Sequence, residues 1–225
     1  MAVPQLRQFS KSSSPRQVDL DKPKLSRPHV WLPREGATRT LLLLHGSGAD
    51  EHDLLSLGRE LDPMANILSP RGSVVQQGMT RFFEYEPDFT PSEESLLAET
   101  AKLAEFVELA SQRYNFLLES LVIVGFSNGS HAGGALLLLR PYLSKTLIAF
   151  GTTQVLPGLA IAPDLHGARV FIANGQQDHY SPEAKTVAMI DQLEGYGAEV
   201  TLLMHPGGHQ ISGDHVRFIA SELRG

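Results

Sequence analysis

Three side chains that together could carry out nucleophilic acyl transfer each follow a short apolar run of the sequence. Ser127 stands in the middle of a Gly-Phe-Ser-Asn-Gly segment, Asp178 follows Gly-Gln-Gln, and His209 follows Pro-Gly-Gly. A serine hydroxyl is a weak nucleophile at neutral pH, so it needs a base within hydrogen-bonding reach, and that base needs a carboxylate to fix its tautomer. The residue types therefore predict Ser127 as the nucleophile, His209 as the general base and Asp178 as the orienting carboxylate.

Each of these residues, taken alone, also has a structural interpretation. Ser127 fits an ordinary glycine-rich turn before a helix, and Asp178 fits a turn aspartate that bonds its own backbone. Their order along the chain, Ser then Asp then His, favours the catalytic interpretation, because each residue ends its own apolar run. His45 and His205 lie closer to their runs, and we expect structural roles for both. A metal site built from His205 and His209 lacks convergent carboxylates, so no metal is expected.

A second glycine-rich turn offers a backbone N–H group to the same site. The apolar run 40–44 is followed by His-Gly-Ser-Gly, whose glycines let the backbone turn so that the N–H of Ser47 points into a cavity. Asn128 follows the predicted nucleophile at a helix start, where its own N–H has no partner within the helix. We predict that these two N–H groups form an oxyanion hole, in which each donor contributes roughly 3–4 kcal/mol to the stability of a tetrahedral intermediate.

Short apolar runs alternate with helical patterns along the chain, and this alternation indicates the fold class. Continuous apolar runs are typical of strands buried on both faces. The predicted strands cover residues 40–44, 66–69, 120–124, 146–150, 170–173 and 200–204. Strands joined by helices form a mostly parallel sheet, because each parallel crossover needs a helix-length connection. The chain is therefore expected to be a doubly wound α/β domain with helices on both faces, which binds ligands at the carboxyl ends of its strands.

The helix boundaries follow from local signals. The segment Thr90-Pro91-Ser92-Glu93 fits a capping box with proline at the first helical position, and it predicts a helix that ends near Arg113. Proline and glycine positions predict three more helices, from 128 to 140, from 182 to about 195, and from 213 to the C-terminus.

Composition excludes several classes of protein. The chain has 225 residues, of which 42% are hydrophobic and 20% charged, and it has no cysteine, which excludes disulfide scaffolds, thiolate metal sites and a cysteine nucleophile. The net charge of −6 gives no general attraction to nucleic acid, so no nucleic-acid partner is expected. The longest nearly apolar stretch, 132–139, is far shorter than the roughly 20 residues that span a bilayer, and no membrane span is expected.

The N-terminal segment differs in composition from the rest of the chain. Residues 1–26 are rich in serine and basic residues, with no hydrophobic core of the kind that a secretory signal requires. We expect a flexible tail over residues 1–26, a single domain over residues 27–225 and a cytoplasmic location; an organelle transit peptide is the alternative for the tail.

Taken in order, these motifs resemble those of the α/β-hydrolase superfamily, and within it the phospholipase/carboxylesterase family of bacterial esterases and acyl-protein thioesterases. The resemblance runs from about residue 29 to residue 225 and is carried by Leu44-His45-Gly46-Ser47-Gly48, Ser69-Pro70-Arg71-Gly72, Gly125-Phe126-Ser127-Asn128-Gly129, Gly175-Gln176-Gln177-Asp178 and Gly207-Gly208-His209. It implies an α/β-hydrolase fold without a large cap domain, the catalytic and oxyanion residues named above, and no metal or organic cofactor. A homodimer is common in this family, and no sequence feature decides the oligomeric state.

The leading hypothesis is a serine carboxylesterase that hydrolyses small-molecule carboxylic esters or thioesters through an acyl-enzyme. An acyl-protein thioesterase or a lysophospholipase is the alternative within the family, although the thioesterase branch usually has glutamine at the position of Asn128. A non-catalytic ligand-binding protein on a hydrolase fold is the alternative from another class. Phe82 and Phe83 lie where family members cover the site, and we expect them to line an acyl or alcohol pocket; simple packing against the following helix is the competing interpretation.

Overall fold

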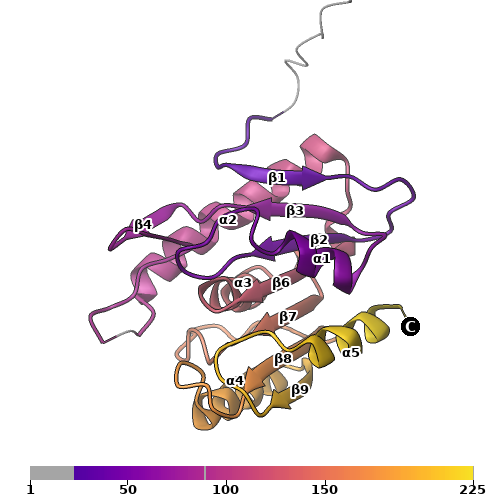
Figure 1. Ribbon diagram of the computed structural model, residues 1–225. Helices are drawn as coiled ribbons and strands as arrows, with labels where there is room; N and C mark the ends of the chain where they lie inside the picture. Colours follow the sequence, from indigo (N-terminus) through magenta and orange to yellow (C-terminus); the bar gives the residue numbers. More distant parts are fainter. Residues whose placement is uncertain (1–22, 89, 225) are drawn as a thin grey trace, which may run out of the picture.

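The computed structural model describes residues 23–88 and 90–224, and its centre is a seven-stranded sheet (Figure 1). Its strands are β1 (His29–Leu32), β2 (Thr40–Leu44), β3 (Asn66–Pro70), β6 (Leu121–Phe126), β7 (Thr146–Phe150), β8 (Arg169–Gly175) and β9 (Glu199–His205). They lie in the order β1-β3-β2-β6-β7-β8-β9, and every neighbouring pair is parallel except β1 with β3. Because β3 and β6 lie on opposite sides of β2, the strand order reverses there, and ligands bind at such points in sheets of this kind.

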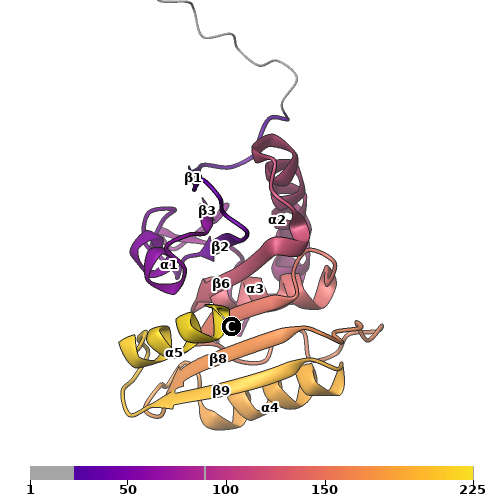
Figure 2. The same ribbon diagram turned by 90° about the vertical axis from the view of Figure 1, so that its right-hand side faces the viewer.

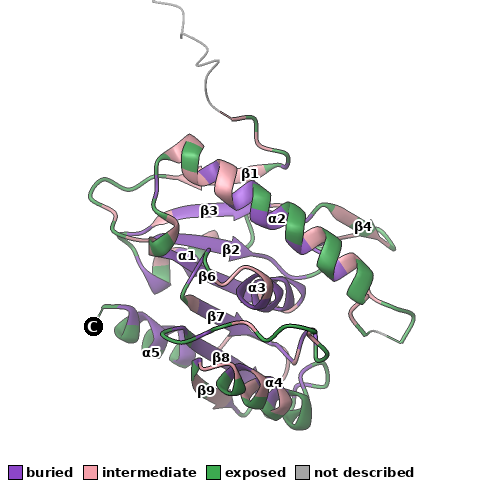
Figure 3. Ribbon diagram, turned by 180° about the vertical axis from the view of Figure 1, so that it is seen from behind, coloured by how far each residue is buried: buried purple, intermediate pink, exposed green. Residues whose placement is uncertain are grey.

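Helices cover both faces of this sheet (Figure 2). They are α1 (Leu55–Leu61), α2 (Glu93–Tyr114), α3 (Asn128–Leu139), α4 (Glu183–Gly195) and α5 (Gly213–Arg224). One face lies under α2, α3 and α4 and the other under α1 and α5, and the helices turn their exposed sides to solvent (Figure 3). The buried side chains form two clusters, with Leu42 and Leu44 of β2 in one and Leu41 and Leu43 in the other. The fully apolar sequence of β2 thus reflects burial on both faces.

The predicted doubly wound α/β architecture is confirmed. All of the predicted strands are present, and their ends differ from the predicted ends by no more than two residues. The structure adds elements that the apolar pattern does not show: α1, the antiparallel edge strand β1, and a hairpin of β4 (Val74–Gln76) and β5 (Met79–Arg81). These elements are short and only partly buried, so their sequences lack a sustained apolar period.

The β4–β5 hairpin turns through two residues with positive φ. Gln77 has φ of 52° and Gly78 has φ of 75°, as in the tight turns that match the twist of paired strands. The hairpin is joined to the loop after β2, because the N–H of Gly48 donates to the carbonyl of Thr80 at 2.9 Å. This hydrogen bond brings the hairpin to the carboxyl end of the sheet.

The predicted capping box at the start of α2 is wrong. The helix begins at Glu93 with Ser92 at its N-cap, and no side chain caps it by a hydrogen bond. Pro91 instead forms a bridge with Tyr85, which holds it outside the helix. The Thr90 hydroxyl donates to the Asp88 carboxylate at 2.7 Å rather than to the helix.

Most of the predicted tail, residues 1–22, lies outside the described residues. The last part of it contacts the domain: Arg113 of α2 donates to the carbonyl of Pro23 at 3.1 Å, and Leu25 packs against the core. None of the helices in the described part of the chain is long and apolar enough to cross a membrane.

Helix α3 lies unusually close to β2. A Cβ atom on Gly129 would stand 2.0 Å from the carbonyl oxygen of Leu44, and one on Gly133 would stand 2.8 Å from the Ile123 side chain. Only glycine fits at the first of these positions, because the atom that a side chain would meet belongs to the backbone.

We expect Gly129→Ala to lower the free energy of unfolding by about 3 kcal/mol or more, the upper part of the range for overpacked positions. The measurement is urea denaturation followed by circular dichroism. Gly195→Ala at the end of α4 is the matched control, because apart from its neighbours in the chain and its own helix backbone nothing lies within 4 Å of the added Cβ, and its stability should be unchanged or slightly raised. Equal stability of the two variants would show that α3 can move away from β2.

Candidate active site

Ser127 occupies a sharp turn between β6 and α3. Its backbone has φ of 53° and ψ of −119°, a conformation that residues other than glycine rarely adopt. The turn is held on both sides of the peptide: the Ser127 N–H donates to the carbonyl of Phe150 at 2.9 Å, and its carbonyl accepts from the N–H groups of Ser130 and His131 at 2.9 and 3.1 Å. The surrounding hydrogen bonds therefore hold the serine in a strained geometry at the carboxyl end of the sheet.

The glycines of the Gly-x-Ser-x-Gly segment account for the tightness of this turn. A Cβ atom on Gly125 would stand 2.5 Å from the carbonyl oxygen of Gly129, so the two glycines face each other across the turn. Gly129 in turn lies against the end of β2. The motif thus has a direct steric explanation in this chain.

Asp178 uses its two carboxylate oxygens for two different tasks. One oxygen accepts from the backbone N–H groups of Tyr180 and Ser181 at 2.8 and 3.1 Å, which is the turn geometry that the sequence also suggests. The other accepts from Nδ1 of His209 at 2.7 Å. The Asp178 side chain is fully buried, so this charge-assisted hydrogen bond lies in a region of low dielectric, where it is strong. The structural and catalytic interpretations of Asp178 are therefore compatible.

The loop that carries His209 is pinned to the rest of the site. A Cβ atom on Gly175 would stand 2.3 Å from the carbonyl oxygens of Gly207 and Gly208, so the loop packs directly on the end of β8. His205 accepts from the Gly207 N–H at 3.0 Å and donates to the carbonyl of Gln210 at 3.1 Å, which spans the loop. His205 thus has the structural contacts that we expect of it.

Ser127 and His209 open onto a shared cavity of about 340 Å³. The other residues that line it are Ser47, Met79, Arg81, Tyr85, Pro91, His131, Gly151, Thr153, Tyr180 and Lys185. Within the described residues no hydrogen bond joins the Ser127 hydroxyl to His209. Catalytic hydrogen bonds are often long before substrate binds and shorten in the complex. The three predicted catalytic residues therefore converge, with the Asp178–His209 pair formed and the serine beside it.

The two predicted oxyanion donors stand at the ends of neighbouring strands, β2 and β6, which pair in parallel. Among the described residues, neither the Ser47 N–H nor the Asn128 N–H donates to a backbone carbonyl, so both remain available to a ligand. The Asn128 side chain has a separate role. Its Oδ1 accepts from the Phe82 N–H at 2.7 Å, and its Nδ2 donates to the Phe83 carbonyl at 3.4 Å.

The prediction that Phe82 and Phe83 line the pocket needs correction. Their exposed fractions are 2% and 0%, and both belong to the core cluster under α2 and α3. Phe82 packs against His45, and Phe83 packs against Tyr85 and His131. Among the described aromatic residues between 82 and 88, Tyr85 lines the cavity. The backbone of Phe82 and Phe83 is hydrogen-bonded to the Asn128 side chain, and both phenylalanine rings lie in the core. Sequence alone does not show this constraint.

His131 is a residue of the site that the sequence analysis missed. It lies four residues after Ser127 on α3, so its ring folds back over the turn: Nδ1 donates to the Ser127 carbonyl at 2.9 Å, and Nε2 accepts from the Thr153 hydroxyl at 2.9 Å. Burial lowers the pKa of His131 to about 4, so the ring is neutral near pH 7. The spacing of four residues from a predicted nucleophile at a helix start is the signal that could have identified it.

His45 joins two loops near the site as a neutral side chain. Its Nδ1 donates to the Gly46 carbonyl at 2.7 Å, and its Nε2 accepts from the Gly72 N–H at 3.0 Å. Burial lowers the pKa of His45. Among the described residues, no group of three or more histidine, aspartate or glutamate side chains is arranged to hold a metal ion.

Comparisons with known proteins identify the family. No family model matches the chain. MhqD of Bacillus subtilis (strain 168), named as a presumed hydrolase, is 36% identical over 172 residues, which cover 76% of this chain and 86% of that protein. The Bacillus cereus carboxylesterase structure is 32% identical with a TM-score of 0.85, over 88% of this chain and 93% of the other. The chain belongs to the phospholipase/carboxylesterase family of α/β-hydrolases.

A further member of this family has the same fold. The carboxylesterase of Mesorhizobium loti is 31% identical with a TM-score of 0.82, over 89% of this chain and 96% of the other. As an α/β-hydrolase of this family, the chain is a hydrolase.

We expect the stability of the protein to fall as the pH is lowered from 6.5 to about 4. In the unfolded chain a histidine takes up a proton near pH 6.5, whereas His131 in the folded chain stays neutral down to about pH 4. The unfolded state therefore binds more protons in this window, and folding loses up to about 3 kcal/mol from this residue. Urea denaturation at a series of pH values measures it.

His131→Gln should flatten the pH dependence between 6.5 and 4, because it removes the group responsible. His166→Gln is the control, since it removes a histidine whose side chain is 83% exposed. An unchanged slope in His131→Gln would mean that other groups cause the acid sensitivity.

Proposed function

We propose that this hydrolase is a serine carboxylesterase that cleaves small carboxylic esters or thioesters through an acyl-enzyme. The hydrogen bond between Asp178 and His209, formed beside the strained turn of Ser127 in one cavity, is the observation that carries this proposal. A base that is oriented by a buried carboxylate can remove the proton of a hydroxyl that lines the same cavity, which turns the hydroxyl into a nucleophile.

The reaction begins when Oγ of Ser127 attacks the ester carbonyl and Nε2 of His209 takes the hydroxyl proton. Asp178 stabilises the imidazolium that forms. The N–H groups of Ser47 and Asn128 donate to the oxygen that becomes negative in the tetrahedral intermediate. His209 then returns the proton to the leaving alcohol or thiol. A water molecule, activated in the same way, releases the acid from Ser127.

Three groups guide the His209 ring toward the serine. The rings of Phe126 and Tyr180 lie 5.0 and 5.1 Å from it, on a centroid-to-centroid measure. Gly151 leaves space for it, because a Cβ atom there would stand 2.7 Å from Cε1 of His209. The imidazole is thus held between aromatic and backbone surfaces while Nδ1 stays bound to Asp178.

The cavity volume supports a small substrate. About 340 Å³ lies at the low end of the range for small-molecule sites, which favours a short ester over the long acyl chains of a protein thioesterase or a lysophospholipase. Action in the cytoplasm on a small-molecule ester is part of the same proposal.

We expect Ser127→Ala to lower kcat/KM for short p-nitrophenyl esters by several orders of magnitude, because it removes the nucleophile. Initial rates for the acetate-to-palmitate series measure the loss and the chain-length preference. The wild-type chain should also gain the mass of one fluorophosphonate adduct, and Ser127→Ala should gain none. A folded wild-type chain that neither turns over esters nor reacts with the probe would favour a non-catalytic binding protein.

Asp178→Asn separates orientation from folding. The amide oxygen can still accept from the N–H groups of Tyr180 and Ser181, but the amide NH₂ would face Nδ1 of His209 and hold the ring in the wrong tautomer. We expect kcat to fall by roughly 10⁴-fold with the fold retained. Steady-state kinetics and thermal unfolding measure the two effects, and full activity in Asp178→Asn would contradict the assigned role of the carboxylate.

A further inference from the structure

Arg81 is the last residue of β5, and it lines the cavity that Ser127 and His209 share. Only 5% of its surface is exposed, so its guanidinium has lost most of its contact with water. Burying a charge is costly unless an opposite charge or strong hydrogen bonds compensate for the lost hydration. The partners of Arg81 therefore indicate what this part of the cavity is built to hold.

Within the described residues, the partners of Arg81 are all neutral. Nε donates to the Ser47 hydroxyl at 3.2 Å, Nη1 donates to the side-chain oxygen of Gln76, and Nη2 faces the sulfur of Met79 at 4.0 Å. The guanidinium carbon also lies 5.2 Å from the ring centre of Tyr85. No carboxylate of the described part of the chain forms a salt bridge with it.

Two arginines of this chain that are more exposed than Arg81 each form a salt bridge with a carboxylate. Arg39 pairs with Asp62 and Arg71 pairs with Glu51, and the side chains of these arginines are 35% and 41% exposed. Both have a carboxylate although water can still reach them. Arg81 is more deeply buried and has none, so its charge is compensated less well than theirs.

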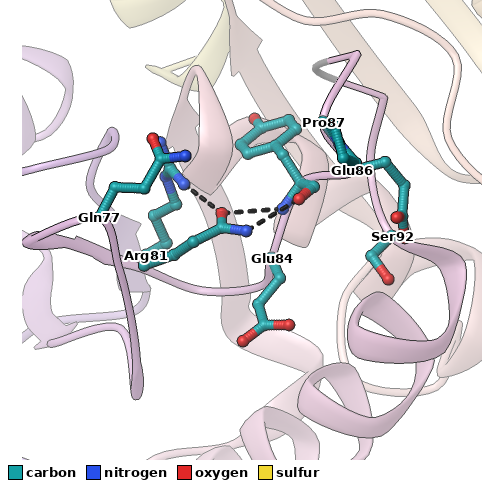
Figure 4. A pocket seen from close by; sticks show the side chains of 8 residues that line it. Gln77, Arg81, Glu84, Glu86, Pro87 and Ser92 are labelled. Atoms are coloured by element: carbon teal, nitrogen blue, oxygen red, sulfur yellow. Dashed lines mark hydrogen bonds between the residues drawn. The ribbon is translucent and has the colours of Figure 1, made fainter.

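The second cavity that Arg81 borders, of about 320 Å³, is also lined by Glu84 and Glu86, and within the described residues neither carboxylate forms a salt bridge with Arg81. Figure 4 shows that the carboxylate of Glu84 in this cavity points away from the guanidinium. The Gln76 side chain is fixed here by the backbone of Tyr85, to which it donates at 2.8 Å and from which it accepts at 3.1 Å. Gln76 thus holds Arg81 in place without neutralising it.

The charged groups around the catalytic cavity have one sign. Of the described residues that line it, Arg81 and Lys185 are cationic and none is acidic. Asp178, the nearest carboxylate of the site, is already bound to His209 and to the backbone. A cationic cavity in a chain of net charge −6 is a local feature that overall composition does not explain.

We propose that the ester cleaved at this site carries a carboxylate, which Arg81 binds while Ser127 attacks the ester carbonyl. A guanidinium has five N–H groups, and three of them face the partners named above, so two remain for a ligand. Its planar fork matches the two oxygens of a carboxylate. The proposal rests on the esterase function proposed above and specifies its substrate class: half-esters of dicarboxylic acids, or acylated hydroxy acids.

The reaction itself is ordinary hydrolysis. Water adds across the acyl–oxygen bond, the acyl carbon gains a hydroxyl, and the leaving oxygen gains a proton. The carboxylate that binds Arg81 is not consumed. In the first substrate class it lies on the acyl group, and in the second it lies on the leaving alcohol.

Matched pairs of esters test the proposal, because each pair differs only by a methyl group in place of a carboxylate. Monomethyl glutarate and methyl pentanoate place the difference on the acyl side, and 3-acetoxypropanoate and propyl acetate place it on the alcohol side. We expect the wild-type chain to have the higher kcat/KM for the carboxylated ester of at least one pair. Arg81→Met should reduce this preference by roughly 10- to 100-fold.

Three further variants distinguish binding of the substrate carboxylate by Arg81 from a purely structural role of this side chain. Arg81→Lys keeps the charge without the fork, so it should keep part of the preference. Lys185→Met removes the exposed cation of the same cavity and should change the preference less. Ser47→Ala removes one of the side-chain partners of Arg81 and leaves the guanidinium charge, so it should affect both esters of a pair by the same factor. Thermal unfolding of every variant checks that it folds.

Two kinetic results would overturn the proposal. If Arg81→Met slows both esters of each pair equally, Arg81 only positions the hairpin and the Ser47 loop. If the wild-type chain prefers the methyl-terminated ester in both pairs, the cavity is not selective for carboxylates. In either case the loss of all activity in Ser127→Ala would leave the esterase function standing.

Calorimetric titration with glutarate gives a readout that does not depend on turnover. We expect the wild-type chain to bind glutarate more tightly than Arg81→Met does, by a factor similar to the change in preference. Should no ester be hydrolysed, the esterase proposal fails, but weaker binding in Arg81→Met would still uphold the anion site. Equal binding by the two proteins would reject it.

Discussion

The contact between the backbone of α3 and the end of β2 is the constraint on which the rest of the site depends. At Gly129 this contact is closer than any side chain permits, since a Cβ atom would stand 2.0 Å from the Leu44 carbonyl oxygen. The helix can begin that near the sheet only if the preceding residue turns sharply, and Ser127 therefore adopts a positive φ of 53°. The same approach places the first N–H of α3 beside the loop that follows β2. The proposed nucleophile and the proposed oxyanion donors are thus positioned by one packing contact.

A second set of contacts gives His209 a fixed position. Sequence suggests a flexible Gly-Gly turn before His209, yet that turn packs on Gly175 and is spanned by His205. The glycines therefore allow the loop to pack closely against the end of β8, and this packing holds the loop in place. Asp178 adds to this rigidity, because its first oxygen anchors its own turn while its second binds the imidazole. Preorganisation of this kind lowers the reorganisation needed when charge develops during a reaction.

Local sequence predicts those parts of the molecule in which the hydrophobicity of each residue follows directly from its own burial. The strands are continuous apolar runs because both faces are buried, so their positions and the residues at their ends follow from the pattern alone. The hairpin and the segment after it follow no such rule. Phe82 and Phe83 have the composition of a pocket wall, but a hydrogen bond from Phe82 to Asn128, 46 residues further along the chain, turns them into the core. His131 was missed because its role depends on the fold of the turn that it covers.

The parts that sequence predicts and the parts that it misses have different functions. Strand ends and close glycine contacts position the proposed catalytic residues, and a side chain at Gly125, Gly129 or Gly175 would meet backbone atoms there. The hairpin, by contrast, is attached to the sheet by few interactions, such as the hydrogen bond from Gly48 to Thr80 and that from Arg81 to Ser47. It supplies Met79 and Arg81 to the cavity wall. In the proposed arrangement the catalytic residues lie at the ends of the sheet strands, whereas Arg81, proposed to select the substrate, lies on the hairpin.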